Sequence, residues 1–264
     1  MYAFSYHRPA NSKAAAALAA KTVDSKLLAG GHTLLPTMKQ RLASPPALID
    51  LGACADLRGI EQKGRTIVIG AMTKHAEVAD SAVVKAAIPA LAELAGMIGD
   101  PAVRNRGTIG GSVANNDPAA DYPAACLALG ATIVTNKRKI AADDFFKGMF
   151  ETALADGEII TKVIFPVPAR AGYAKFRNPA SRYALVGVFV AKKGGEVRAA
   201  VTGAGSNGVF RCTPIEAQLT AKFNAKMLDT VKIPATGINA DMHADAAYRA
   251  HLIVVMAKRA VMAA

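Results

Sequence analysis

Two short glycine-rich segments carry the clearest chemical potential in this chain. Residues 28–35 read Leu-Ala-Gly-Gly-His-Thr-Leu-Leu, and residues 104–115 read Arg-Asn-Arg-Gly-Thr-Ile-Gly-Gly-Ser-Val-Ala-Asn. Glycine has no Cβ, so the backbone can adopt positive φ and approach a ligand closely. Successive backbone N–H groups in such a turn form a concave anion site. A single Gly-Gly pair is usually only a tight turn, but two loops of the same chemistry predict a pair of clamps on a ligand with two phosphates.

Metal chemistry is not indicated by the cysteines and histidines. The three cysteines lie far apart and form no Cys-x-x-Cys pair, whereas iron–sulfur clusters and structural zinc need about four clustered ligands. Three unpaired thiols fit a reducing compartment. The five histidines show no metal-ligand spacing. We expect His75 and His251 on helix surfaces, and only His32, inside the first loop, is placed to donate a hydrogen bond to a phosphate.

The overall composition excludes several classes of protein. The chain has 264 residues and a net charge of +12, but its basic residues are scattered and do not alternate with aromatic ones, which argues against nucleic-acid binding. An acidic partner subunit or an anionic cofactor explains the charge equally well. No apolar run reaches the about 20 residues of a transmembrane helix, and the N-terminus lacks the order of a signal peptide. The expected location is therefore the cytoplasm.

Three successive units must position the two loops, and the first covers residues 1–55. A strand over residues 25–29 runs into the first loop, and a helix over residues 34–42 leaves it. An alanine-rich helix over residues 12–21 precedes these elements, and an apolar strand over residues 47–51 follows them. A helix that begins at the loop adds its N-terminal dipole to the phosphate site.

Residues 56–172 and 173–264 form the second and third units. Helices and strands of the second unit are expected over residues 59–70, 73–82, 88–98, 122–130, 131–135, 139–141 and 158–167. Those of the third unit are expected over residues 184–192, 196–203, 215–219, 225–233 and 246–262. The spacing of apolar residues in the last helix predicts that Arg249, Lys258 and Arg259 face outward.

Residues 203–208 match the pattern Gly-x-Gly-x-x-Gly and follow a strand. A dinucleotide-binding fingerprint requires a helix that opens within the motif, so that its N-terminus faces the pyrophosphate. Here the helix signal comes later, at Thr213-Pro214, and no following strand carries an acidic residue at the required distance. The segment is therefore interpreted as a turn that leaves a strand. The P-loop and the Gly-x-Ser-x-Gly elbow are absent from the sequence.

The amino-acid sequences of the two loops and of three further segments resemble those of one family, the FAD-binding medium subunit of the molybdenum hydroxylases. These enzymes include aerobic carbon monoxide dehydrogenase and xanthine dehydrogenase. The segments that carry the resemblance are residues 29–35, 41–50, 104–115, 117–125 (Asp-Pro-Ala-Ala-Asp-Tyr-Pro-Ala-Ala) and 181–184 (Ser-Arg-Tyr-Ala). The resemblance covers residues 4–259. It implies an α+β fold, with a two-subdomain FAD-binding domain of the PCMH type (vanillyl-alcohol-oxidase-like) in residues 1–55 and 56–172. A C-terminal domain, residues 173–264, is then a three-stranded antiparallel sheet with a helical bundle.

The resemblance also implies which residues bind FAD. Both loops are expected to wrap the pyrophosphate, Asp121 to supply an acidic contact, and Ile160 a backbone contact at the adenine end. Lys175 matches a lysine of the family, and Tyr183 matches an aromatic residue that borders the flavin ring. The full set is Ala29, Gly30, Gly31, His32, Thr33, Thr108, Ile109, Gly110, Gly111, Ser112, Asn115, Asp121, Ile160, Lys175 and Tyr183. For Asp121 the alternative is a helix N-cap, and no side chain is expected to be catalytic.

The function implied by the resemblance is that of an oxidoreductase subunit for electron transfer. A large molybdenum-cofactor subunit oxidises the substrate, and a small subunit with [2Fe–2S] clusters relays the electrons to this FAD, which passes them to an external acceptor. Molybdopterin and iron–sulfur clusters are expected only in these partners, in a dimer of heterotrimers in the cytoplasm or at the inner face of the cytoplasmic membrane. Two alternatives remain, a stand-alone flavin-dependent oxidoreductase and a catalytically silent assembly subunit.

Overall fold

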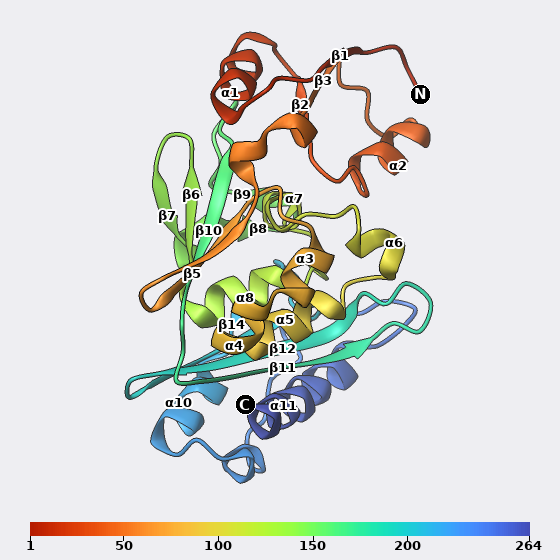
Figure 1. Cartoon of the computed structure of the whole chain (residues 1–264). Coiled ribbons are helices and arrows are strands. Elements are labelled where there is room, and N and C mark those ends of the chain that lie inside the picture. Colours follow the sequence, from red (N-terminus) through yellow and green to blue (C-terminus); the bar gives the residue numbers. More distant parts are fainter.

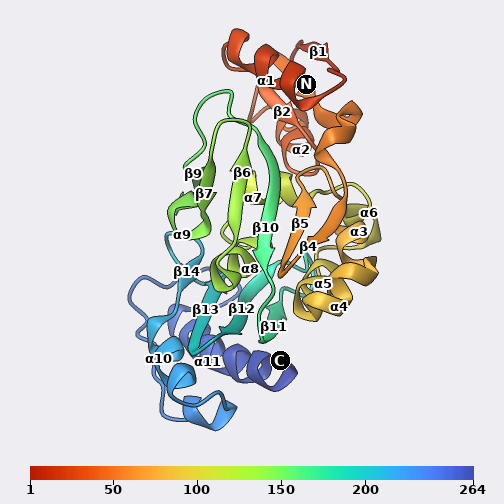
Figure 2. The ribbon, with the colours of Figure 1, turned by 60° about the vertical axis from the view of Figure 1, so that its left-hand side comes forward.

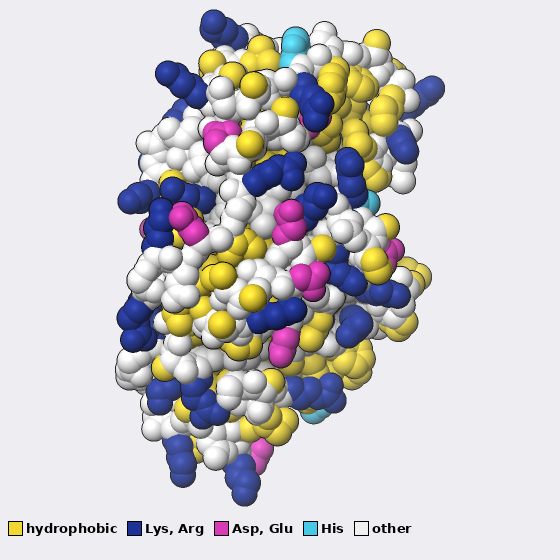
Figure 3. Space-filling model, viewed as in Figure 1, with side chains coloured by type: hydrophobic (Ala, Val, Ile, Leu, Met, Phe, Trp, Pro, Cys, Tyr) yellow, Lys and Arg dark blue, Asp and Glu magenta, His cyan; other side chains and the backbone are white.

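Three sheets follow one another along the long axis of the molecule, with the N-terminus at one end and the C-terminal helix at the other (Figure 1). The computed structural model describes all residues from 1 to 264. Lys and Arg side chains are scattered over the face shown in Figure 3 and do not gather in one patch. None of the helices is long and apolar enough to cross a membrane.

The first sheet is parallel, has the order β1-β3-β2, and carries the first loop at its edge. Its elements are β1 (Ser5–His7), α1 (Ser12–Lys21), β2 (Lys26–Leu28), α2 (Leu34–Lys39) and β3 (Ala47–Asp50), followed by the 3-10 turns Leu51–Ala53 and Ala55–Leu57. Only seven buried residues form the core of this part, and two of them, Met72 and Ile159, come from later in the chain. The first sheet therefore depends on the second for part of its packing.

The second sheet is antiparallel, with the order β4-β5-β10-β6-β7. Its strands are β4 (Ile60–Lys63), β5 (Thr66–Gly70), β6 (Thr132–Thr135), β7 (Lys139–Ala141) and β10 (Ile160–Pro166). The helices around it are α3 (His75–Asp80), α4 (Ala82–Ala87), α5 (Pro89–Gly96), α6 (Pro101–Arg104), α7 (Ile109–Asn115), α8 (Tyr122–Leu129) and α9 (Ala142–Phe145), and a small hairpin pairs β8 (Phe146–Gly148) with β9 (Glu151–Thr152). Every residue of α8 is buried, which explains why its sequence is apolar all round rather than on one face.

The third sheet is antiparallel and lies between α8 on one side and α11 on the other (Figure 2). Its elements are β11 (Arg170–Arg177), β12 (Ala184–Lys193), β13 (Glu196–Thr202), β14 (Phe210–Arg211), α10 (Thr213–Ala221), the 3-10 turn Ala225–Leu228 and α11 (Ala246–Ala263). Phe189 and Ala191 face the core of the second sheet, whereas Val188 and Val190 face α10 and α11. Because successive side chains point to opposite faces of a strand, a strand covered on both faces must be apolar, as β12 is from Ala184 to Ala191 before it emerges at Lys192 and Lys193.

The α+β fold expected from the sequence is confirmed, with two refinements in the third sheet. The three long antiparallel strands are extended by β14, which has only two residues. The helix expected over residues 225–233 is a single 3-10 turn that ends at Leu228. Residues 203–208 form a turn after β13, as the sequence indicated, since β13 ends at Thr202 and the next helix begins at Thr213.

Two side chains expected at the surface are buried. Arg249 on α11 is 2% exposed and His75 on α3 is 5% exposed. The Arg249 guanidinium donates to the carbonyls of Leu185 and Gly203 and forms an ion pair with Asp241 at 2.6 Å. These contacts satisfy the charge, so the arginine can lie on the apolar face of its helix.

Candidate functional site

The first glycine loop leaves β2 and leads into α2. Gly31 has φ of +76°, a conformation that glycine adopts without the steric penalty of other residues. None of the backbone N–H groups of residues 30–33 donates to a backbone carbonyl. Because unpaired N–H groups in succession attract an anion, this loop has the donors that a phosphate needs.

Backbone hydrogen bonds hold the second glycine loop against residues 71–73, in the segment that connects β5 and α3. Ile109 N donates to Thr73 O at 3.1 Å, and Gly110 N donates to Ala71 O at 2.8 Å. A Cβ on Gly110 would lie 2.5 Å from the Ala71 side chain, so only glycine fits there. The Thr108 hydroxyl accepts from Gly111 N at 3.2 Å and caps α7.

The structure brings the two loops into direct contact. A Cβ built on Gly30 would lie 2.3 Å from the carbonyl oxygen of Arg106, and one built on Gly111 would lie 3.5 Å from the Ala29 side chain. The first loop therefore packs on the second with no room for a side chain between them. His32 and Thr33 lie exposed beside this contact.

Asp121 and Lys175 come together in a buried ion pair between the start of α8 and β11. Lys175 Nζ lies 2.9 Å from the Asp121 carboxylate, the two side chains are 1% and 5% exposed, and Tyr173 donates a hydrogen bond to the same carboxylate. Burial raises the pKa of Asp121, while Lys175 opposes that rise. Asp121 occupies the N-cap position of α8, as the alternative held, but its side chain makes no capping hydrogen bond and is directed to Lys175 and Tyr173 instead. The positive charge of Lys175 is thus balanced within the protein.

Tyr183 lies in the connection between β11 and β12 and is about half exposed, with 48% of its surface accessible. It lines a polar cavity of about 340 Å³ together with Asp117, Phe150 and Arg249. Burial, followed by the charges of Asp117 and Asp121, raises the pKa of Tyr183. This tyrosine therefore stays protonated and presents its ring and hydroxyl at the mouth of the cavity.

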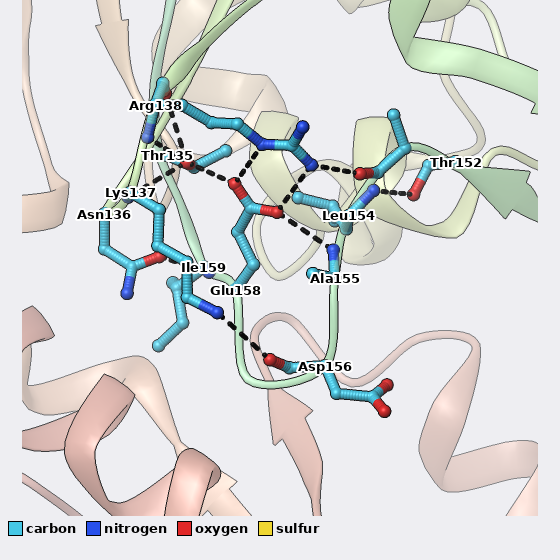
Figure 4. A network of polar contacts seen from close by, with 11 residues as sticks. Thr135, Asn136, Lys137, Arg138, Thr152, Leu154, Ala155, Asp156, Glu158 and Ile159 are labelled. Carbon is cyan, nitrogen blue, oxygen red and sulfur yellow. Dashed lines mark hydrogen bonds and ion pairs between the residues drawn. The ribbon is translucent and has the colours of Figure 1, made fainter.

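Ile160 begins β10, where a network of polar contacts holds the chain (Figure 4). The Glu158 carboxylate accepts from Arg138 at 3.0 Å, from Thr135 at 2.6 Å and from Ala155 N at 2.9 Å. Arg138 lowers the pKa of Glu158 to about 2. One residue beyond Ile160, Thr161 O accepts from Ala71 N at 2.9 Å, and Ala71 is the residue on which Gly110 packs. Ile160 is therefore connected to the base of the second loop.

The remaining predicted residues fall into the same region. Ser112 and Asn115 lie on α7 behind the second glycine pair, and both are partly exposed. The predicted residues thus fall into three groups. The two loops pack on each other, Asp121 pairs with Lys175, and Tyr183 lines the cavity. No group of three or more potential metal ligands occurs in the chain.

Two residues near this region were missed by the sequence analysis. Arg249 fixes the ends of β12 and β13 next to Tyr183. Its position could have been predicted, because it lies three, four and seven residues before buried Leu252, Ile253 and Met256 and so shares their helical face. His75 lies directly behind Gly107 of the second loop. That contact joins two distant segments, and no local pattern announces it.

Comparison with known proteins identifies similar chains. Residues 2–168 match the family described as FAD binding domain in molybdopterin dehydrogenase. The sequence is 37% identical to the carbon monoxide dehydrogenase medium chain of Hydrogenophaga pseudoflava, over 99% of this chain and 96% of that one. It is 34% identical to the nicotine 6-hydroxylase medium subunit of Paenarthrobacter nicotinovorans, over 99% and 97%. The structure superposes on reconstituted CO dehydrogenase from Oligotropha carboxidovorans with a TM-score of 0.90 and 34% identity, over 100% of this chain and 98% of that one.

Proposed function

Since the chain belongs to the family of FAD-binding domains in molybdopterin dehydrogenases, we propose that it is the electron-transfer subunit of a molybdenum hydroxylase. The observation that carries this proposal is the contact between the two glycine loops. Gly30 packs on the Arg106 carbonyl where a side chain would clash, and residues 30–33 offer N–H groups that no backbone carbonyl takes. These features fit the pyrophosphate of FAD.

The residues proposed to hold FAD are those that the sequence resemblance indicates, in the places where the structure has them. They are Ala29, Gly30, Gly31, His32, Thr33, Thr108, Ile109, Gly110, Gly111, Ser112, Asn115, Asp121, Ile160, Lys175 and Tyr183. When bound, FAD supplies the redox chemistry, which belongs to the cofactor rather than to the protein. The first loop would bind and orient it through the unpaired backbone N–H groups of residues 30–33. The second loop, whose Ile109, Gly110 and Gly111 N–H groups already have acceptors in the protein, would hold the first loop in place. The proposal assigns no acid or base role to any side chain.

The surroundings of the loops have distinct proposed roles. The Lys175–Asp121 pair is neutral as a whole, so it places polar groups near the cofactor without adding net charge. The Tyr183 ring can cover a flat ligand face, and its hydroxyl keeps its proton because burial, followed by the charges of Asp117 and Asp121, raises its pKa. Arg249 would act indirectly. It donates to the carbonyls of Leu185, near the start of β12, and Gly203, just after β13, and so fixes the strand that begins next to Tyr183.

We propose that electrons reach this subunit from a small partner with [2Fe–2S] clusters and leave to an external acceptor. A large molybdenum-cofactor partner would oxidise the substrate, and the assembly would be a dimer of heterotrimers in the cytoplasm. Support comes from the relatives, which are named as medium chains or subunits of dehydrogenases and hydroxylases. Within this chain, the proposed division is an FAD-binding domain of two parts, residues 1–55 and 56–172, and a C-terminal domain over residues 173–264.

The cofactor proposal is tested by adding one methyl group between the loops. Gly30→Ala places a Cβ against the Arg106 carbonyl, so we expect FAD affinity to fall by about tenfold or more, the range seen when packed neighbours are forced apart. Affinity is measured by titrating the apoprotein with FAD and following flavin fluorescence. The visible spectrum and chromatography of heat-released flavin give the stoichiometry in the unmodified chain.

The matched control is Gly195→Ala, at a turn where an added Cβ has nothing within 4 Å. It should bind FAD as the unmodified chain does. Full FAD affinity in Gly30→Ala, with the fold intact by circular dichroism, would contradict the assignment of the cradle. An unmodified chain that neither contains nor takes up FAD would overturn the proposed function.

A further inference from the structure

Behind the second glycine loop lies a histidine for which the proposed function gives no role. His75 begins α3 and is 5% exposed. Its backbone N donates to Gly107 O at 3.0 Å, and the adjacent Lys74 forms a bridge with Thr108. The start of α3 and the corner of the loop are therefore joined along the backbone.

The imidazole ring lies directly under the same corner. A Cβ built on Gly107 would lie 2.5 Å from His75 Nε2 and 2.8 Å from Cδ2. On its other side, the ring packs on Tyr122 of the buried helix α8, with 5.4 Å between ring centroids. The ring thus fills the space between the loop and the core.

Contacts continue from the loop corner to the first loop. The Arg106 carbonyl, one residue before Gly107, is the atom on which Gly30 packs. Tyr122, His75, the Arg106–Gly107 peptide and Gly30 therefore form a continuous column from the core to the first loop. A larger or smaller side chain at position 75 would therefore change the position of the second glycine loop relative to the first.

The ring acts in this column by its shape rather than through hydrogen bonds. Its buried Nδ1 has no hydrogen-bond partner, and neither has the hydroxyl of Tyr122. Burial, with smaller electrostatic effects from His32 and Arg104, lowers the pKa of His75 to about 4. The imidazole is therefore neutral near pH 7, as a group packed in a core without a counter-charge must be.

We propose that His75 is a positioning residue for the cofactor, whose ring sets the separation of the two glycine loops. This inference rests on the proposed function, because the loops are the proposed clamps on the FAD pyrophosphate. His75 itself need not touch the cofactor. It supports the Arg106–Gly107 peptide, which directly precedes Thr108 of the proposed cradle, and it keeps the two loops at the spacing that a single ligand must bridge.

The test is a double-mutant cycle between His75 and Gly107. His75→Ala removes the support, and Gly107→Ala adds a methyl group that meets the ring, so each change alone should weaken FAD binding by about tenfold. In the double variant the new methyl occupies space that the ring has left. We therefore expect the double variant to bind FAD more tightly than either single variant, whereas independent effects would multiply to about a hundredfold loss.

The measured quantities are the FAD dissociation constant and the thermal midpoint of the FAD-free chain. A matched control is His251→Ala, an exposed histidine on α11, which should change neither. His75→Gln retains a flat uncharged group of similar length. We therefore expect its FAD dissociation constant to rise by less than half as much as that of His75→Ala. If His75→Ala fails to fold, a cycle of His75→Val, Gly107→Ala and the double variant measures the same coupling, because valine also vacates the space at Gly107 while it leaves a smaller cavity.

Multiplicative losses in the cycle would overturn the role of His75 and leave the proposed function intact, provided that the unmodified chain binds FAD. Rescue of the thermal midpoint without rescue of affinity would also overturn it, since the ring would then serve folding alone. Absence of FAD binding in the unmodified chain would instead overturn the proposed function, and this inference with it.

Discussion

At the scale of single residues, the buried positive charge of Lys175 is neutralised by Asp121 and is not left over for a ligand. Lys175 could be supposed to offset the charge of a phosphate, but its ammonium is 1% exposed and lies 2.9 Å from Asp121. A buried ion pair of this kind stabilises little relative to apolar residues, yet the loss of one partner leaves the other charge uncompensated. The charge of Lys175 therefore compensates that of Asp121, and a ligand phosphate could use it only if this ion pair were broken.

This pairing predicts the effect of Lys175→Met. The change leaves the Asp121 carboxylate buried with only Tyr173 as a partner, so the free energy of unfolding at pH 7 should fall by about 3 kcal/mol. Lys175→Met/Asp121→Asn removes both charges and should recover most of the loss. Urea unfolding followed by circular dichroism measures both values. A double variant no more stable than Lys175→Met would show that the buried charge is not the cause.

The sequence predicted the loop residues better than it predicted the side chains behind them. Glycine pairs with adjacent hydroxyls reveal a backbone that must approach something closely, because the reason is local to the loop. The burial of His75 depends on Gly107, about thirty residues later in the chain, and that of Arg249 depends on carbonyls from two strands. Such contacts arise only when distant segments meet, so the sequence gives no local sign of the burial of His75. For Arg249 the helical spacing to Leu252, Ile253 and Met256 does indicate the buried face, but not the carbonyls that accept its charge.

At the scale of elements, the same distinction between local and distant causes applies. The first and last residues of α1 and the position of α8 follow from helix signals in the sequence. The residue pattern did not identify strand β11, which Gly172 interrupts, although the family resemblance implied a third strand in this domain. The structure shows the reason, since a Cβ on Gly172 would lie 1.9 Å from the backbone oxygen of Ala260 on α11. Glycine lowers the strand propensity but lets the helix lie directly on the sheet.

The turn between β6 and β7 and the start of β10 are joined by Glu158, which predicts a pH effect. Its pKa is about 2 in the folded chain because Arg138 donates to its carboxylate, against an ordinary value near 4.5. The folded state is therefore stabilised by the ionised group above about pH 4.5, and this contribution is lost as the pH falls toward 2. Arg138 is half exposed, so solvent screening limits the gain to about 1–2 kcal/mol.

Glu158→Gln should remove that contribution. We expect the variant to be less stable than the unmodified chain at pH 7, and the difference to shrink steadily between pH 4.5 and pH 2.5, measured by thermal unfolding. Glu61→Gln is the control, because this β4 carboxylate is 54% exposed and pairs only with the exposed Lys63, so that its charge contributes little to stability. A difference that stays constant with pH would show that the Glu158 charge does not stabilise the fold.

At the scale of the whole molecule, the two glycine loops sit on parts of very unequal stability. The second loop belongs to a region with a core of 32 buried residues, whereas the first lies on a sheet whose core has seven. Regions with few buried apolar contacts open locally at low free energy. In the absence of a ligand, the first loop is therefore the more mobile half of the proposed clamp.

A ligand that bridges both loops must consequently stabilise the first sheet most. Binding adds free energy to the bound state in proportion to the logarithm of ligand concentration over the dissociation constant, and β2, α2 and β3 have the most opening to suppress. We expect FAD to slow amide hydrogen exchange strongly over residues 26–50 and weakly in β12, whose core is complete without it. At an FAD concentration close to the dissociation constant of the unmodified chain, Gly30→Ala should show little protection over residues 26–50. Equal protection of both regions, or protection confined to the second loop, would mean that FAD does not join the two parts of the chain.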